Sequence, residues 1–89
     1  MNKYAQTPQA TLDLHQHTQH QARAAVRAFL SESEHAGYNL VRIIVGRGIH
    51  SKEGPVLGDA VRALLRDADY EFRDAKIGEG AEGAIDVKL

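Results

Sequence analysis

The stretch LVRIIVGRGIHSKEGP, residues 40–55, joins a nearly continuous apolar run to a glycine-rich, cationic loop. A run such as residues 40–45 is typical of a strand that is buried on both faces of a sheet. Pro55 suits the first turn of a helix, because proline lacks the N–H group that this turn leaves unbonded. The stretch therefore predicts a central strand, a loop and the start of a helix.

A shorter strand and a helix are predicted ahead of this stretch. In residues 10–15, ATLDLH, Leu12 and Leu14 alternate with polar neighbours, as in a strand with one buried face. A helix is expected from Gln19 to Ala36. Its apolar face is formed by residues at helical spacing: Ala22, Ala25, Val26, Phe29 and Leu30. Thr18 and Gln21 have the form of a capping box at its start, and Gly37 is a suitable stop at its end.

The second half of the chain predicts a helix followed by two strands. Apolar positions after Pro55 mark a second helical face: Val56, Leu57, Ala60, Val61, Leu64, Leu65 and Ala68. Residues 70–75 alternate and residues 84–89 end the chain, so each predicts a strand. The glycines at 78, 80 and 83 are expected to serve the turn of an antiparallel hairpin.

The predicted order is β-α-β-α-β-β, an α/β protein of the α+β two-layer kind. A β-α-β unit places its two strands parallel with a right-handed crossover. Two helices then cover one face of a four-stranded mixed sheet, whose strand order the sequence does not give. Residues 1–9 are expected to be a disordered tail and residues 10–89 the domain.

Composition narrows the class of protein. The 89 residues suit one domain, and the chain has no cysteine for disulfides or thiolate metal sites. No apolar run is long enough for a membrane span and no signal peptide is evident, so a cytoplasmic protein is expected. A net charge of −1 argues against a non-specific nucleic-acid coat protein, but it leaves room for an enzyme with a local basic patch.

Candidate site residues meet at one edge of the predicted sheet. The carboxyl ends of two parallel strands share an edge, where ligands collect. Asp13 and His15 end the first strand, and the loop follows the second. Glycines, an arginine fork and the amides of a helix N-terminus suit a phosphate. The loop residues expected to contribute are Gly46, Arg47, Gly48, His50, Ser51 and Lys52.

A rival interpretation is a metal site in HQHTQH, residues 15–20. Two imidazoles at H-x-H spacing beside Asp13 could hold zinc or another divalent ion. The spacing places His15 and His17 on one face only if the strand continues to residue 17. Each residue also has an ordinary structural role, such as a solvated loop, a helix cap or an edge histidine.

Taken in order, these motifs resemble the Smr (small MutS-related) domain family. The resemblance rests on LDLH at 12–15, GRGIHS at 46–51, Gly54 with the apolar pair after it, AVRALL at 60–65 and the last strand. It implies a β-α-β-α-β-β fold in two layers. It also implies nicking of DNA or cleavage of RNA, in some members stimulated by a metal ion, and it places this chain among stand-alone members.

The resemblance assigns the first family signature to Asp13 and His15 and the second to Gly46, Arg47 and Gly48. Two positions depart from the family pattern: Gln16 stands where the family has glycine, and Val45 where it has histidine or threonine. His50 could supply an imidazole instead of residue 45.

The expected function is therefore phosphodiester hydrolysis on DNA or RNA, including structured or branched forms. Arg47 and the loop amides would hold the phosphate and stabilise charge in the transition state. His15 would act as general base or acid, and Asp13 would orient it or hold Mg²⁺ or Mn²⁺. The alternative is a binding module that uses the same edge without catalysis.

Overall fold

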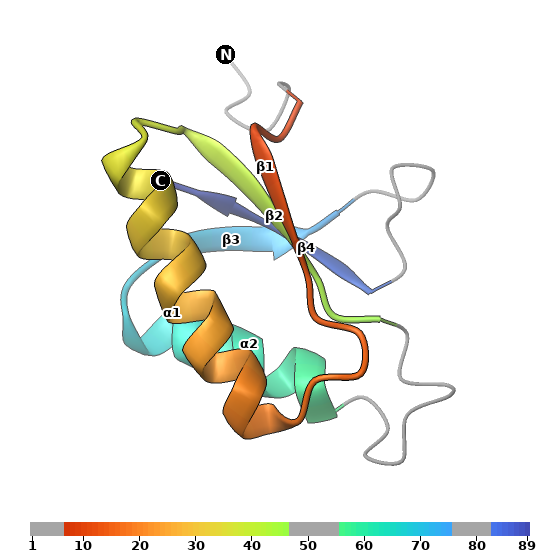
Figure 1. The fold of residues 1–89 in the computed structure, drawn as a ribbon. Coiled ribbons are helices and arrows are strands. Elements are labelled where there is room, and N and C mark those ends of the chain that lie inside the picture. Colours follow the sequence, from red (N-terminus) through yellow and green to blue (C-terminus); the bar gives the residue numbers. More distant parts are fainter. Residues whose placement is uncertain (1–6, 47–55, 76–82) are drawn as a thin grey trace.

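The structure, a computed structural model, describes residues 7–46, 56–75 and 83–89. Figure 1 shows six elements in the predicted order: β1 (Ala10–Asp13), α1 (Gln19–His35), β2 (Leu40–Ile44), α2 (Val56–Asp67), β3 (Glu71–Asp74) and β4 (Ala84–Lys88). Each lies within two residues of its expected bounds. No helix of the described ranges is long and apolar enough to cross a membrane.

The four strands form one mixed sheet in the order β1-β2-β4-β3. β1 runs parallel to β2, and Leu12 pairs with Ile43. β4 is antiparallel to both β2 and β3. The antiparallel final pair is thus confirmed, and β4 inserts between β2 and β3. This order makes β2 and β4 the central strands, which agrees with the nearly continuous apolar run of β2 and the burial of four of the five β4 residues.

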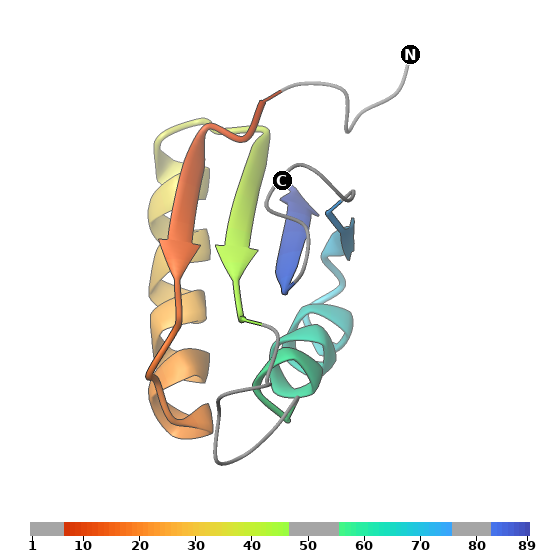
Figure 2. The ribbon, with the colours of Figure 1, turned by 90° about the vertical axis from the view of Figure 1, so that its right-hand side faces the viewer.

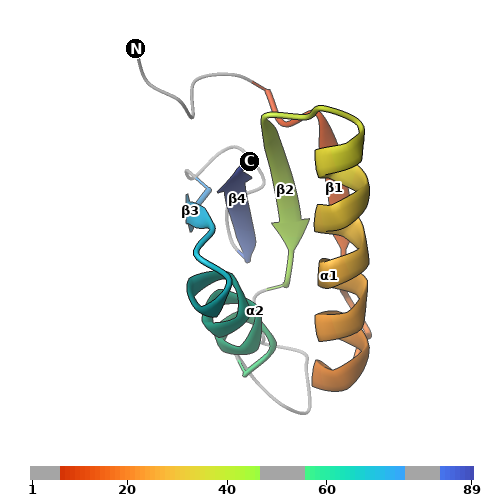
Figure 3. The same ribbon diagram turned by 90° about the vertical axis from the view of Figure 1, so that its left-hand side faces the viewer.

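Both helices pack on the same face of the sheet (Figures 2 and 3), which confirms the two-layer prediction. The apolar side chains between the layers include Leu14, Val26, Ile43, Val61 and Ile85, each 0% exposed. They come from α1, β2, α2, β4 and the residue that follows β1, while β1 and β3 add the half-buried Leu12 and Phe72. Burial of this apolar surface is the main favourable term in folding.

Local signals set both ends of α1. Thr18 Oγ1 accepts from Gln21 N at 3.1 Å, and Gln21 Oε1 accepts from Thr18 N at 3.0 Å, which is the predicted capping box. At the other end Gly37 has φ +78°. There, Gly37 N donates to Glu34 O and Tyr38 N to Ser33 O, the two hydrogen bonds of a Schellman motif.

The sheet face away from the helices carries charge. Register and alternation place Arg42, Asp86 and Arg73 side by side on β2, β4 and β3. Arg42 Nε lies 2.7 Å from Asp86 Oδ1, and Arg73 Nη2 lies 4.0 Å from Asp86 Oδ2. The Asp86 side chain is 2% exposed, so this carboxylate is buried between the two arginines.

Pairing with β2 already begins at Gln9, the last residue of the expected tail. Gln9 N donates to Leu40 O at 2.8 Å, and Gln9 Oε1 accepts from the backbone N–H groups of Asn39 and Leu40. Residues 1–6 of that tail lie outside the described residues.

Candidate functional site at the carboxyl ends of β1 and β2

The carboxyl ends of β1 and β2 lie side by side, as expected. Asp13 pairs with Ile44, and Leu14 N donates to Ile44 O at 2.8 Å, so the parallel pairing continues beyond the last strand residue. This brings Asp13 and His15 next to Val45 and Gly46. The other expected loop residues, Arg47, Gly48, His50, Ser51 and Lys52, lie outside the described residues.

Asp13 and His15 form a hydrogen-bonded pair. His15 Nδ1 lies 2.8 Å from Asp13 Oδ1, which also accepts from His15 N at 3.0 Å. The hydrogen bond from the His15 backbone N–H, followed by the one from its imidazole, lowers the pKa of the Asp13 carboxyl. The ionised carboxylate holds the proton of a neutral imidazole on Nδ1, and therefore leaves Nε2 as the basic nitrogen.

The pair is accessible to a large ligand. The His15 side chain is 67% exposed and the Asp13 side chain 49%. Asp13 belongs to the sheet face away from the helices, because Leu12 and Leu14, its neighbours along the chain, pack toward them. A basic imidazole nitrogen supported by a carboxylate and open to solvent can take a proton from a molecule bound at this edge.

Gln16 turns the chain out of β1 with a left-handed backbone. Its φ is 68°, a region that favours glycine because other residues place Cβ against the backbone there. This position is the one where the sequence departs from the family glycine. The departure therefore affects the backbone conformation of the turn. Gln16 adopts the same left-handed turn with its side chain exposed, at some cost in free energy.

The histidine-rich segment bends instead of continuing the strand. β1 ends at Asp13, and His17 N donates to Leu14 O in the turn that follows. The condition for His15 and His17 to share a strand face is therefore not met. His17 Nδ1 lies 3.3 Å from His15 O, so this nitrogen carries the proton as a donor.

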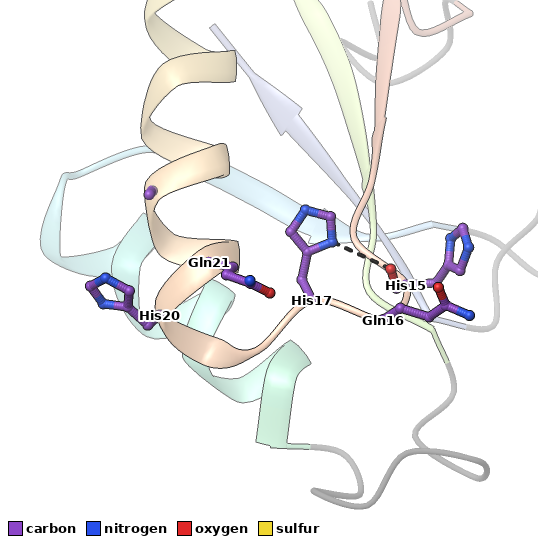
Figure 4. Close-up of a pocket in the computed structure, with 6 residues that line it drawn as sticks. His15, Gln16, His17, His20 and Gln21 are labelled. Atoms are coloured by element: carbon purple, nitrogen blue, oxygen red, sulfur yellow. Dashed lines mark hydrogen bonds between the residues drawn. The ribbon is translucent and has the colours of Figure 1, made fainter.

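A shallow depression of about 600 Å³ lies beside the Asp13–His15 pair (Figure 4). Its lining comes from the turn and the first turns of α1: His15, Gln16, His17, His20, Gln21 and Ala24. Figure 4 shows the three imidazoles spread along this rim instead of gathered around one point. Among the described residues, no group of three or more metal-ligating side chains converges.

Val45 fills the position where the family has histidine or threonine. Its side chain is 7% exposed and belongs to the core between the layers. A Cβ added at Gly58 of α2 would lie 3.4 Å from Val45 Cγ2, so position 45 faces α2. Asp13 belongs to the opposite face of the sheet. Valine at position 45 therefore removes no partner from the Asp13–His15 pair.

Gly83 supports the start of the loop, a role that the sequence did not indicate. Its carbonyl oxygen accepts from Val45 N at 2.6 Å and from Gly46 N at 3.0 Å. Gly46 and Gly83 both have left-handed backbones, with φ of 80° and 84°. A Cβ at position 83 would meet the Gly46 carbonyl group and lie 2.8 Å from its Cα. The two glycines allow this backbone-to-backbone contact.

Comparison with known proteins identifies the family to which this chain belongs. A family profile for the Smr domain matches residues 12–89, and the chain belongs to the Smr domain family. In an uncharacterised protein from Treponema pallidum, 59 residues align at 40% identity. They make up 66% of this chain and 29% of that protein, so this chain spans less than a third of that relative's length.

Solved structures of Smr domains share the fold. The Smr domain of Thermus thermophilus MutS2 is 30% identical with a TM-score of 0.80, over 90% of this chain and 96% of that one. YdaL, a stand-alone small MutS-related protein from Escherichia coli, is 27% identical with a TM-score of 0.82, over 96% of this chain and 68% of that one. The human small-MutS related domain is 25% identical with a TM-score of 0.60, over 88% of this chain and 98% of that one.

Proposed function

We propose that this Smr domain is an endonuclease that binds DNA or RNA at the carboxyl ends of β1 and β2 and hydrolyses a phosphodiester bond there. The observation that carries the proposal is the Asp13–His15 pair, with 2.8 Å between Asp13 Oδ1 and His15 Nδ1 and with His15 largely exposed. Membership of the Smr family supports the choice of a nucleic acid as the substrate.

In the proposed reaction His15 is the general base. Its Nε2 takes a proton from the attacking water, whose oxygen forms the new bond to phosphorus while the bond to the leaving oxygen breaks. The leaving oxygen takes a proton from solvent. Asp13 holds the ring orientation and stabilises the imidazolium that forms, because its carboxylate stays within hydrogen-bond distance of Nδ1.

Arg47 and the backbone amides that follow Gly46 are assigned to the phosphate. A guanidinium can donate two parallel hydrogen bonds to phosphate oxygens, and such donors stabilise the charge that grows in the transition state. Gly46 is the one member of this loop set within the described residues. Its position against Gly83 anchors the point at which the loop begins.

Mg²⁺ or Mn²⁺ fits this site only as an ion shared with the substrate. Asp13 Oδ1 is occupied by two hydrogen bonds from His15, so Asp13 could offer a cation its second oxygen. One carboxylate together with substrate phosphates is a common way for proteins to bind Mg²⁺. The ion would neutralise phosphate charge there.

The test is cleavage of supercoiled plasmid and of a labelled stem–loop RNA, with and without Mg²⁺ or Mn²⁺. We expect His15→Ala to abolish cleavage and to keep binding, and Arg47→Ala to weaken binding. His35→Ala is the matched control, because this exposed histidine lies at the far end of α1. Cleavage by His15→Ala at the wild-type rate would refute the mechanism.

A binding module without catalysis is the second candidate, and one observation favours it. The Asp13–His15 pair is open to solvent, whereas exclusion of water strengthens electrostatic catalysis. In that case wild-type protein would bind the same nucleic acids in a gel shift without cutting them, and His15→Ala would bind as the wild type does.

A further inference from the structure

The charges of α1 are ordered in a way that helix stability does not explain. The chain has no carboxylate from residue 14 to residue 31, and α1 has no acidic residue in its first turn. Its carboxylates, Glu32 and Glu34, fall in the last turn, where the helix dipole disfavours negative charge. α2 has the favourable order instead, with Asp59 in its first turn and Arg66 in its last.

Three cationic or ionisable side chains share one stripe of α1 within this acid-free stretch. His20, Arg23 and Arg27 lie at positions i, i+3 and i+7, which a helix brings to one side. His20 and Arg27 are exposed and Arg23 is half-buried. We call these three residues the α1 cationic stripe.

The two arginines of this stripe have no partner among the described residues. Arg42, Arg62 and Arg73 each lie within 4.0 Å of an aspartate. No such ion pair involves Arg23 or Arg27 in residues 7–46, 56–75 and 83–89. Within the described part of the chain, therefore, no carboxylate neutralises these two guanidinium groups.

The stripe is continuous with the candidate site. His20 and Ala24, in the first turns of α1, line the same depression as His15 (Figure 4). Figure 3 shows that α1 runs from the carboxyl ends of β1 and β2 back along the sheet, so successive residues of the stripe lie farther from that edge. At Arg27 it meets a second depression of about 380 Å³ that Glu34 and Asp67 also line, and there the positive charge ends.

We propose that the α1 cationic stripe binds the phosphodiester backbone of the nucleic acid that flanks the bond at the Asp13–His15 pair. A polynucleotide is the anion whose charges repeat along a line. His20 and Arg27 are separated by about 10 Å along the helix at ~1.5 Å per residue. That is about three nucleotide steps of ~3.4 Å. The inference rests on the proposed function and adds to it the path of the bound strand, which runs from the Asp13–His15 pair along α1.

The test is the salt dependence of binding to a fluorescein-labelled stem–loop RNA and to a labelled DNA duplex. Each lost phosphate contact lowers the slope of log K against log[salt] by about 0.9 for a duplex and about 0.7 for a single strand. We expect Arg23→Gln/Arg27→Gln to lower the slope by about 1.4–1.8 and to weaken binding at low salt. Glutamine keeps the helix propensity, and circular dichroism checks the fold.

Arg66→Gln is the matched control, because it removes the same charge from an exposed position of the other helix. An unchanged slope in the double variant, or an equal loss per arginine in Arg66→Gln, would overturn the inference and leave the proposed function standing. Absence of salt-dependent binding by the wild type to both probes would overturn the inference and the proposed function together.

Discussion

Gly83 and Gly46 touch backbone to backbone, and this contact ties the end of β2 to the start of β4. The Gly83 carbonyl oxygen accepts from Val45 N and Gly46 N, and both glycines have a left-handed backbone. A Cβ at position 83 would meet the Gly46 backbone, so this position has no room for a side chain. The loop that begins at Gly46 therefore leaves the sheet from a position that β4 fixes. The contact links a residue of the hairpin to the geometry of the candidate site.

Gly83→Ala should destabilise the domain by about 2–4 kcal/mol, because a left-handed alanine and an overpacked contact add their costs. Its Cβ would meet the Gly46 backbone, which cannot rotate away as a flexible side chain can. Urea denaturation measures the free energy of unfolding.

Gly37→Ala is the matched control for Gly83→Ala. Gly37 has a similar φ of +78°, but a Cβ there would have nothing within 4 Å. It should therefore cost about 1 kcal/mol, the backbone part alone. Equal losses from the two substitutions would mean that the contact between Gly83 and Gly46 contributes nothing.

Asp86→Asn should destabilise the domain by about 3 kcal/mol, because it leaves a partly buried arginine pair without its counter-charge. The Asp86 side chain is 2% exposed, and its two oxygens accept from Arg42 at 2.7 and 3.2 Å. Thermal and urea unfolding measure the loss.

Asp74→Asn provides the comparison for Asp86→Asn. Asp74 accepts from Arg62 at 2.8 Å, but its side chain is 67% exposed, so the substitution should cost less than about 1 kcal/mol. If Asp86→Asn proved as mild as Asp74→Asn, the buried ion pair would not stabilise the sheet.

Local patterns predicted the elements well because each one carries its own signals. The capping box of Thr18 and Gln21 and the Gly37 stop set α1 to within one residue of its expected end. Alternation in β1 also placed Asp13 and His15 at the strand end, where the structure finds them hydrogen-bonded. These features depend on residues that are close in sequence.

The strand order and its consequences could not be predicted from the sequence. Arg42 meets Asp86, and Gly46 meets Gly83, only because β4 inserts between β2 and β3. No spacing in the sequence encodes that insertion. For the same reason the sequence assigns Gly83 only to a turn, although its left-handed φ of 84° also suits the contact with Gly46.

Acid should remove the stabilisation that Asp13 provides. Its pKa is lowered in the folded state, so its contribution is complete above the unfolded value of about 4 and disappears as the pH falls through the lower folded value. Asp13→Asn should therefore be less stable than the wild type at neutral pH, and the difference should close in acid. Unfolding curves over a pH series measure this, and NMR titration of the carboxyl carbon reports the pKa itself.

A pH-independent difference between the wild type and Asp13→Asn would contradict the hydrogen-bonded pair. Asp59→Asn is a suitable control. Its side chain is 77% exposed and lies 3.8 Å from Arg62, so its removal should cost less than about 1 kcal/mol at neutral pH.

Gln16→Gly should leave the domain equally stable or more stable, by up to about 1 kcal/mol. Glycine relieves the left-handed backbone at φ 68°, which costs other residues about 1–2 kcal/mol, and this gain is partly offset by about 0.5–1 kcal/mol of lost backbone entropy. Gln16→Val should be less stable than the wild type, because β-branched residues tolerate positive φ least. Differential scanning calorimetry orders the three proteins. A valine variant as stable as the glycine variant would show that the turn after β1 does not require a left-handed residue, and the departure from the family glycine would then need another explanation.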